Sequence, residues 1–308
     1  MKPILKIGTR ESELAVWQAT QVQNLLKKKG FSSELVFIKS EGDIDTVTPL
    51  YELGVQGIFT KTLDAALLNN KIDIAVHSMK DVPTQLAKGI QQAAVLERGS
   101  YKDILVYKES KDFLINEKSI AIIATSSIRR KAQWLHRYPK HSIENLRGNV
   151  NTRLKKVYIN NWHGAIFAAA GLERINLRPE NSLDLDWMLP APAQGAIMMV
   201  CREDDQISFG ACEVFNDSDT ALCTKLERDF LRKLLGGCST PISALAEVIK
   251  DKIIFKGNLC SPDGKQKIEI EKNVLIKNSG QLGTDSANEI LKNPDAQKII
   301  YSIRNEKN

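Results

Sequence analysis

The stretch PILKIGTRESELAVWQATQVQNLLKKKGFSSELVFIKS (residues 3–40) sets the pattern that decides the fold. An apolar run suited to a strand, PILKIG, comes first. In the next segment Leu14, Trp17 and Leu25 recur at helical spacing, and Gly30 is a helix stop signal. A second strand-like run, SELVFIKS, follows. This alternation predicts α/β layers around mostly parallel sheets.

The alternation continues along the chain until about residue 216. Strands are expected at residues 72–77, 104–107, 120–125 and 164–169, with helical patterns between most of them. Polar or Pro-rich segments at 97–103 and 189–195 are predicted boundaries. Beyond residue 216 one strong helix, ALCTKLERDFLRKLL, precedes two alternating runs joined by the turn SPDG, which predicts a hairpin within a separate α+β domain.

The composition is that of a globular protein, with 43% hydrophobic and 26% charged residues among 308. That length is enough for two or three domains with their own cores. No apolar run approaches the roughly 18 residues that a membrane-spanning helix needs. The N-terminal apolar run is short and meets charge too soon for a signal peptide. We therefore expect a cytoplasmic protein with no membrane partner.

The five cysteines form no recognisable disulfide or zinc pattern, so no metal site is predicted. Cys201 and Cys223 lie in apolar runs and are expected to be inert core residues. Cys238 differs because it follows two glycines in LLGGCSTP, beyond the end of a predicted helix. A lone loop cysteine is more often incidental than reactive, so a role for Cys238 needs independent support.

Positive charge gathers in one window and at the ends of predicted strands. Residues 125–155 carry a net charge of +7, which exceeds the +6 of the whole chain. Four strand-to-helix turns bear basic or hydroxyl side chains: TRES, SMKDVP, TSSIRR and RGNVNTR. Free backbone N–H groups, the helix dipole and arginine forks at such turns suit carboxylates. We infer a cleft for a polyanionic ligand in preference to a solvated basic surface. Phosphate chemistry is disfavoured, because neither a Walker loop nor a dinucleotide fingerprint is present.

Asp81 is an acid beside Lys80 in one of these basic turns. One interpretation is a turn-former ahead of Pro83. The other is a catalytic carboxylate that the surrounding positive charge keeps ionised. The sequence by itself leaves both open.

Seven motifs resemble those of the porphobilinogen deaminase family, also called hydroxymethylbilane synthases. They run in family order: GTRESELAVWQA (8–19), HSMKDVP (77–83), TSSIRRKAQ (125–133), LRGNVNTRL (146–154), AAAGLERI (168–175), PAQGAI (192–197) and LLGGCSTPI (234–242). Together these motifs are far more specific than any one of them.

The resemblance implies two similar α/β domains of the two-lobed binding-protein type and a smaller C-terminal α+β domain. The expected bounds are 1–98 with 197–216 for the first domain, 103–191 for the second and 217–308 for the third. It also implies a dipyrromethane cofactor, held by a thioether to Cys238. Four porphobilinogen molecules then add with loss of ammonia, and water releases hydroxymethylbilane. We expect a monomer with this substrate and no nucleic-acid partner.

The resemblance also assigns roles to the residues of the basic turns. Asp81 is expected to face the pyrrole nitrogens and to stabilise a cationic azafulvene. The residues expected to hold the cofactor carboxylates are Lys80, Ser127, Arg129, Arg130 and Arg153. Those expected near the incoming ring are Arg10, Ser12, Gln18, Thr125, Ser126, Arg147 and Arg174.

This chain departs from the family pattern at two places. Val55 and Gln56 stand where a glycine and a lysine are common, and Ala193 replaces a glycine before the Gln-Gly pair. Because residues 43–59 form a long segment without clear periodicity, we hypothesise that they are a lid over the anionic cleft. The departures bear on lid behaviour and rate, and leave the reaction type unchanged.

Two rival classes of protein remain to be separated from the enzyme. A two-lobed binding protein for a polycarboxylate needs the arginines but has no use for Cys238 or for Asp81 in a basic site. A nucleic-acid binder would use residues 125–155, but stacking side chains in that window are few beyond Trp134 and Tyr138. A colour reaction with Ehrlich's reagent separates the three, because only the enzyme carries a pyrrole.

Overall fold

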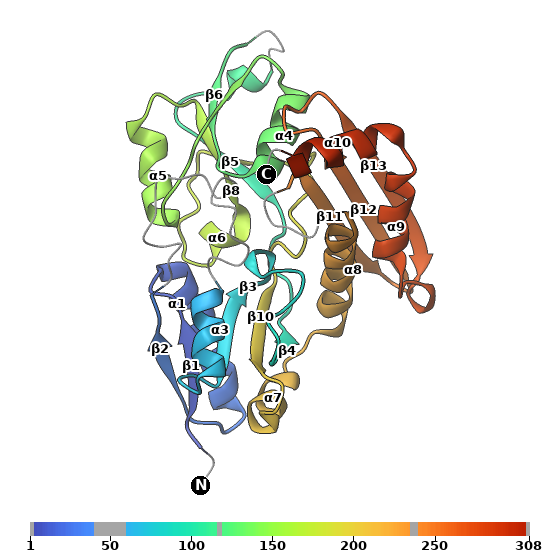
Figure 1. Cartoon of the computed structure of the whole chain (residues 1–308). Helices are drawn as coiled ribbons and strands as arrows, with labels where there is room; N and C mark the ends of the chain where they lie inside the picture. The colour runs from blue at the N-terminus through green and yellow to red at the C-terminus, as the bar shows by residue number, and fades with distance from the viewer. Residues whose placement is uncertain (1–2, 40–59, 116–118, 235–239, 306–308) are drawn as a thin grey trace.

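The computed structural model of this chain describes residues 3–39, 60–115, 119–234 and 240–305. Three sheets organise the described residues, and helices cover them (Figure 1). The first lobe holds the N-terminus, the second lobe lies at its opposite end in Figure 1, and a third unit lies beside both. The predicted lid, residues 43–59, lies outside the described residues, as does Cys238.

The first lobe is a five-stranded sheet with helices on both faces. Its strand order is β2 (Ser33–Phe37), β1 (Leu5–Thr9), β3 (Ile74–Ser78), β10 (Ile197–Arg202) and β4 (Ile90–Val95). The first three strands are parallel, while β10 runs antiparallel to both of its neighbours. Helices α1 (Glu13–Lys28) and α7 (Gln206–Glu213) pack on one face and α3 (Lys61–Leu68) on the other.

The second lobe repeats this plan. Its strand order is β7 (Ser142–Glu144), β6 (Ile122–Ala124), β8 (Gly164–Ala168), β5 (Asp103–Tyr107) and β9 (Ser182–Asp184), and β5 is the antiparallel member. Helix α4 (Ile128–Arg137) covers one face, and α5 (Val150–Ile159) with α6 (Ala169–Glu173) covers the other. The prediction of two similar α/β lobes is therefore confirmed.

The chain crosses between the lobes twice, at 96–102 and at 185–196. In each lobe the antiparallel strand is the one that the chain enters directly after a crossing. The crossings touch where Gly99 N–H donates to the Gly195 carbonyl at 3.1 Å. Gly195 has φ +89°, and a Cβ there would lie 2.6 Å from the Gly99 oxygen, so only glycine fits. Ala193 is also left-handed, at φ +61°, which explains why a glycine is common there.

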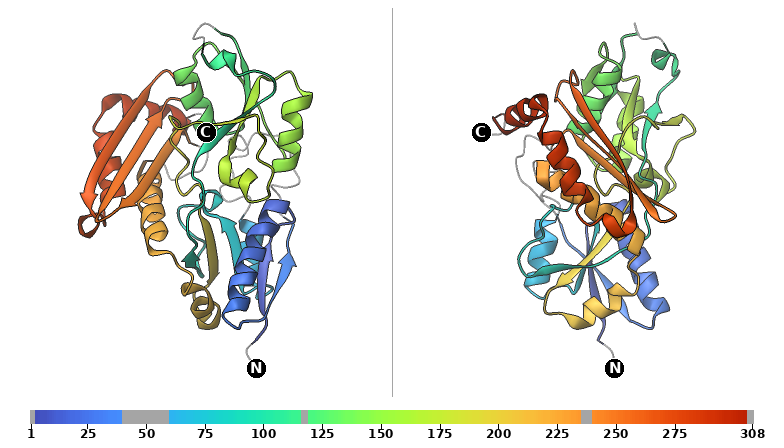
Figure 2. Two further views of the ribbon diagram at one scale, coloured as in Figure 1. Left: turned by 180° about the vertical axis from the view of Figure 1, so that it is seen from behind. Right: turned by 90° about the vertical axis from the view of Figure 1, so that its right-hand side faces the viewer.

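The third unit is an antiparallel sheet of β11 (Ile242–Ile249), β12 (Lys252–Cys260) and β13 (Lys267–Leu275). Helices α8 (Ser218–Leu234), α9 (Leu282–Leu291) and α10 (Pro294–Asn305) share one core with the sheet (Figure 2). Alternate residues of β12, Phe255 among them, face these helices. The ring of Phe255 packs edge-on against that of Phe230, with 5.4 Å between the ring centroids. The predicted α+β unit and its hairpin are confirmed.

A buried ion pair ties both crossings to the third unit. Arg98 donates to both carboxylate oxygens of Glu227 on α8, at 2.6 and 3.0 Å. Glu227 is fully buried and also accepts from the backbone N–H groups of Ala193 and Ala246. This carboxylate therefore fixes the crossings against α8 and β11. No helix in the described part of the chain combines the length and apolar character needed to cross a membrane.

Candidate active site

The predicted basic turns meet between the lobes. Parallel strands β1 and β3 of the first lobe, and β6 and β7 of the second, deliver their following turns to facing edges of the two sheets. Asn151, near the start of α5, donates to the Glu13 carboxylate at the start of α1 at 2.8 Å, so the two lobes touch there. The turns gather one set of positive side chains, which we call the interlobe cluster: Arg10, Lys80, Arg129, Arg130, Arg147 and Arg153.

Electrostatic coupling shows that this cluster spans both lobes. Withdrawal from solvent is the main reason that the pKa of Arg153 falls to about 10. The positive charges of Arg130, Arg147 and Arg10 also lower this pKa, although Arg10 belongs to the other lobe. The carboxylate of Asp81 acts in the opposite direction. One acid of the first lobe therefore lies within electrostatic range of the arginines of the second.

Asp81 is exposed at the end of a short 3₁₀ turn, η1 (Met79–Asp81), that follows β3. Met79 anchors the turn because its side chain is buried. Helix α8 of the third unit clamps the turn through Arg228, which donates to the carbonyl oxygens of Met79, Val82 and Pro83 at 3.3, 2.9 and 2.6 Å. Sequence reasoning missed Arg228, because on a helix it is indistinguishable from a solvated charge.

Lys80 points toward the junction of the lobes. Its Nζ donates to Oε1 of Gln194 at 3.1 Å. Burial lowers the pKa of Lys80 to about 8, although the charges of Asp81 and Asp103 raise it. Arg129 and Arg130 lower the pKa of Lys80 as well. The lysine is thus placed among cations that an anionic ligand would neutralise.

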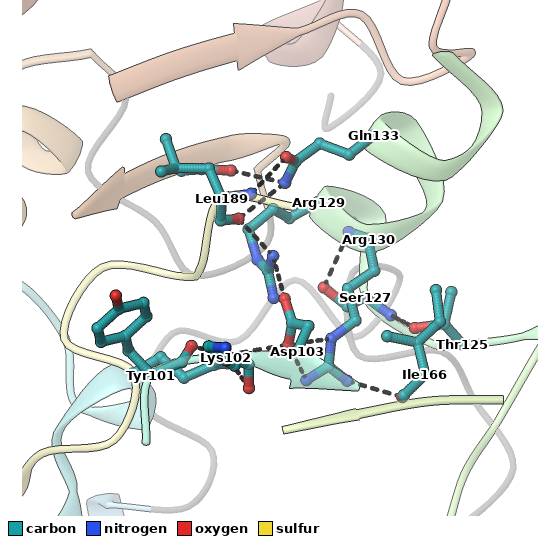
Figure 3. Close-up of polar contacts among 12 residues, drawn as sticks. Tyr101, Lys102, Asp103, Thr125, Ser127, Arg129, Arg130, Gln133, Ile166 and Leu189 are labelled. Atoms are coloured by element: carbon teal, nitrogen blue, oxygen red, sulfur yellow. Dashed lines mark hydrogen bonds and ion pairs between the residues drawn. The ribbon is translucent and has the colours of Figure 1, made fainter. Parts of the chain in front are cut away.

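Arg129 and Arg130 converge on a buried carboxylate that sequence reasoning did not single out, Asp103 (Figure 3). Arg129 donates from one terminal nitrogen to Asp103 at 2.7 Å and to the Leu189 carbonyl at 2.8 Å. Arg130 donates to Asp103 from Nε and a terminal nitrogen at 3.0 and 2.7 Å, and to the Ile166 carbonyl at 3.0 Å. Both arginines are therefore fixed by the protein before any ligand arrives.

The hydroxyl side chains of the second lobe shape the turns that carry the arginines. Ser127 is the N-cap of α4 and accepts from the Arg130 backbone N–H. Thr125 accepts from the Ser127 N–H at 3.2 Å. Ser126 donates to the Leu146 carbonyl, next to the buried Arg147. The loop TSSIRR is thus joined to the loop LRGNVNTR.

The remaining predicted residues lie on or near the first lobe. Ser12 is the N-cap position of α1, without a side-chain cap bond. Gln18, which is buried, donates to Ser78 at the end of β3 at 2.8 Å. Arg174 reaches across from the second lobe, donates to the Gly195 carbonyl at 2.6 Å and lies over the Trp17 ring at 5.7 Å. Arg174 therefore contacts both a crossing and α1.

The four cysteines that the structure describes are buried: Cys201, Cys212, Cys223 and Cys260. Burial raises the pKa of Cys201 to about 11 and that of Cys212, Cys223 and Cys260 to about 12. These thiols are inert, as expected for Cys201 and Cys223. Cys238, the predicted attachment residue, lies outside the described residues between α8 and β11.

Two family models cover most of the chain. Residues 5–208 match the porphobilinogen deaminase domain that binds the dipyrromethane cofactor, and residues 221–292 match the C-terminal domain of the same family. The methionine-binding protein MetQ has a TM-score of 0.45 at 16% identity, over 70% of this chain and 91% of that protein. The fold assignment rests on the strand orders above and not on that likeness.

Curated relatives agree with the family models. The porphobilinogen deaminase of Listeria welshimeri is 37% identical over 99% of this chain and 100% of that protein. That of Chlorobium phaeobacteroides is 38% identical over 99% of both chains. The probable porphobilinogen deaminase of Methanocaldococcus jannaschii is 41% identical over 87% of this chain and 94% of that protein. The chain therefore belongs to the porphobilinogen deaminase family, the transferases that build hydroxymethylbilane from porphobilinogen on a dipyrromethane cofactor.

Proposed function

We propose that the interlobe cluster of this chain binds the carboxylates of the cofactor and of the growing pyrrole chain, and that Asp81 acts on the ring being joined. The reaction itself is that of the family: four porphobilinogen molecules condense in turn, with loss of ammonia, into a linear tetrapyrrole. The observation that carries the proposal is a single exposed carboxylate coupled to cations of both lobes.

The charges of the site fit a dipyrromethane. The interlobe cluster supplies six cations, and the acids Asp81 and Asp103 are coupled to members of it. Each pyrrole ring carries one acetate and one propionate, so a dipyrromethane brings four carboxylates. The cluster therefore carries an excess of positive charge, which suits a ligand that bears several carboxylates. A neutral or cationic ligand would leave these charges uncompensated.

The proposed division of labour follows the loops. Lys80, Arg129, Arg130 and Arg153, with Ser127 at the start of α4, hold the cofactor carboxylates. Arg10, Arg147 and Arg174 bind the carboxylates of the incoming ring. Around them Ser12, Gln18, Thr125 and Ser126 line the site, the last three through the internal hydrogen bonds that set the shape of the turns.

When bound, the cofactor would supply the free pyrrole carbon to which the first ring is joined. The chain's own contribution is electrostatic. Asp81 accepts hydrogen bonds from pyrrole N–H groups and stabilises the positive charge that develops on the substrate ring as ammonia leaves. Cations of both lobes lie within electrostatic range of Asp81, so a ring that binds there lies among charges that also attract its carboxylates. Arg228 holds the turn in place, so that the carboxylate keeps its direction while rings are added.

Comparison of two aspartate variants tests this role. Asp81→Asn keeps the shape and removes the charge, so turnover should fall by about 10²- to 10⁴-fold while the cofactor stays bound. The matched control is Asp112→Asn, because Asp112 is also exposed in a 3₁₀ turn, η2 (Asp112–Leu114), and that turn carries no residue of the interlobe cluster. Near-normal turnover of Asp81→Asn would make Asp81 a turn residue only.

Attachment of the cofactor at Cys238 is supported by the motif and by the inert character of the other thiols. The intact mass of the purified protein should exceed 34.4 kDa by one dipyrromethane, located on the peptide that contains Cys238. Cys238→Ser should have the mass of the bare chain, whereas Cys260→Ala should carry the cofactor. An active protein of unmodified mass would refute the attachment.

The same proposal includes the domain bounds, the oligomeric state and the cellular location of the protein. We assign residues 1–98 with 197–216 to the first domain, 103–191 to the second and 217–308 to the third. The two crossings between sheets support this assignment. We further propose a monomer that works in the cytoplasm. Sedimentation of the purified protein at the mass of one chain would support the first point, and cell fractionation tests the second.

A further inference from the structure

Asp103, the first residue of β5, is completely buried, and both oxygens of its carboxylate accept hydrogen bonds. Its carboxylate accepts one hydrogen bond from Arg129, two from Arg130 and one from Nε2 of Gln194, at 2.7 to 3.0 Å. Burial by itself would raise the pKa of Asp103, but the two guanidinium groups hold that pKa well below its usual range. A carboxylate with no exposed surface, whose oxygens accept four hydrogen bonds from the protein, is not placed to exchange protons with a substrate. Its contribution is to hold the arginines.

Gln194 lies between this carboxylate and the first lobe. It is 1% exposed, and its side-chain amide has one possible orientation. Nε2 donates to Asp103 at 2.9 Å and to the Tyr101 carbonyl at 2.8 Å, and both partners are acceptors only. Oε1 therefore faces Lys80, whose ammonium group is a donor only. The Gln194 amide therefore bridges the Asp103 carboxylate of the second lobe and the Lys80 ammonium group of the first lobe.

The backbone around Gln194 holds this hydrogen-bonded bridge in place. Its two neighbours, Ala193 and Gly195, are both left-handed, and its own carbonyl accepts from Nε of Arg98 at 2.8 Å. The segment is thus pinned to the other crossing. Lys80, Arg129 and Arg130, here called the inner cations, would repel one another if they were left without Asp103 and Gln194.

We propose that Asp103 and Gln194 are positioning residues, which hold the inner cations at fixed places in both lobes for the cofactor carboxylates. The inference rests on the cofactor-binding role proposed above for these cations. Neither residue touches the reacting atoms. Asp103 sets the directions of the two guanidinium groups, and Gln194 sets Lys80 relative to them.

The titration of Lys80 reports on this arrangement. The charged groups that act on Lys80 are Asp81 and Asp103, which favour its ammonium form, and Arg129 and Arg130, which oppose it. Removal of the Asp103 charge leaves both arginines uncompensated, so Lys80 should lose its proton at lower pH. Removal of the Gln194 amide deletes one acceptor of the ammonium group and should shift the titration in the same direction.

The experiment measures labelling of Lys80 in the full-length holoenzyme. A small amine-directed reagent is applied between about pH 6 and pH 10, and modification is read by mass spectrometry of the Lys80 peptide. The test variants are Asp103→Asn and Gln194→Met. Their controls are Asp184→Asn, which removes an acid from a half-exposed ion pair, and Gln133→Met, which removes a buried amide that joins α4 to β11.

The midpoint of labelling should fall by about one pH unit in both test variants and stay at the wild-type value in both controls. If Asp103→Asn does not fold, Gln194→Met against Gln133→Met gives the same comparison. Unchanged midpoints in the test variants, or an equal fall in Gln133→Met, would overturn the inference. The variant Lys80→Gln tests the cofactor-binding role of Lys80 independently of the labelling. If the intact mass of that variant shows a full cofactor load, Lys80 does not hold the cofactor, whatever the labelling shows.

Discussion

Arg228 offers the most direct test of how the third unit contributes to the site. Its guanidinium group on α8 donates to three carbonyl oxygens of the segment that carries Lys80 and Asp81. The change Arg228→Met keeps the aliphatic part of the side chain and removes these bonds. The turn should then keep its local 3₁₀ shape, because Met79 remains buried, but lose its fixed place relative to the other lobe.

The expected magnitude follows from the contacts. Two of the three hydrogen bonds are short, at 2.9 and 2.6 Å, and the third is long at 3.3 Å. A hydrogen bond from a charged donor contributes about 1.5–3 kcal/mol. Arg228 is only half-buried, so water replaces part of each bond, and the expected loss in the free energy of unfolding is about 2 kcal/mol. A small displacement of Asp81 should also lower kcat by about 10- to 100-fold.

Two assays check these values, with Arg232→Met as the matched control. Arg232 lies one turn further along α8, is more than half exposed and pairs only with Asp229 among the described residues, so its loss should change stability by less than about 0.5 kcal/mol. Denaturant unfolding measures the first effect and steady-state turnover of porphobilinogen the second. Equal turnover in the Arg228→Met and Arg232→Met proteins would refute the clamp.

Three further predictions concern the crossings, pH and elongation. Gly195→Ala should lower the free energy of unfolding by more than about 2 kcal/mol, because a Cβ at φ +89° meets backbone 2.6 Å away, whereas Gly210→Ala in open space on α7 should not destabilise. Burial, with a smaller effect of Arg10, lowers the pKa of His77 from 6.5 to about 4. The free energy of unfolding should therefore be highest above pH 6.5 and fall by about 2–3 kcal/mol as the pH drops toward 4. Denaturant titrations at both pH values should show a smaller fall for His77→Asn than for the wild type. Arg147→Gln should accumulate covalent intermediates of intermediate length in mass spectra, while Arg130→Gln should fail earlier, at cofactor loading; the same spectrum from both would contradict their separate roles.

Much of the fold follows from local pattern. The predicted strands at 72–77, 104–107, 120–125 and 164–169 are present as β3, β5, β6 and β8, and no end differs by more than two residues. The hairpin at 261–264 joins β12 to β13 as expected. Period, stop signals and turn residues act over a few positions, so the sequence specifies them directly. Polar and Pro-rich composition at 97–103 and 189–195 indicates boundaries that overlap both crossings, but no local pattern indicates that β10 and β5 pair into opposite lobes.

For the site, local sequence patterns specify which side chains are available. Basic turns after strands had to gather at facing edges of α/β sheets, and the motifs identified the family and pointed to Asp81 and Cys238. Only the tertiary structure decided which groups hold those side chains in place. Asp103 lies 26 residues from Arg129, Gln194 lies 114 from Lys80, and Arg228 lies 149 from Met79. Contacts at such separations form only when sheets and helices pack. The burial of a single carboxylate or amide follows no sequence periodicity, so the sequence pattern does not predict it.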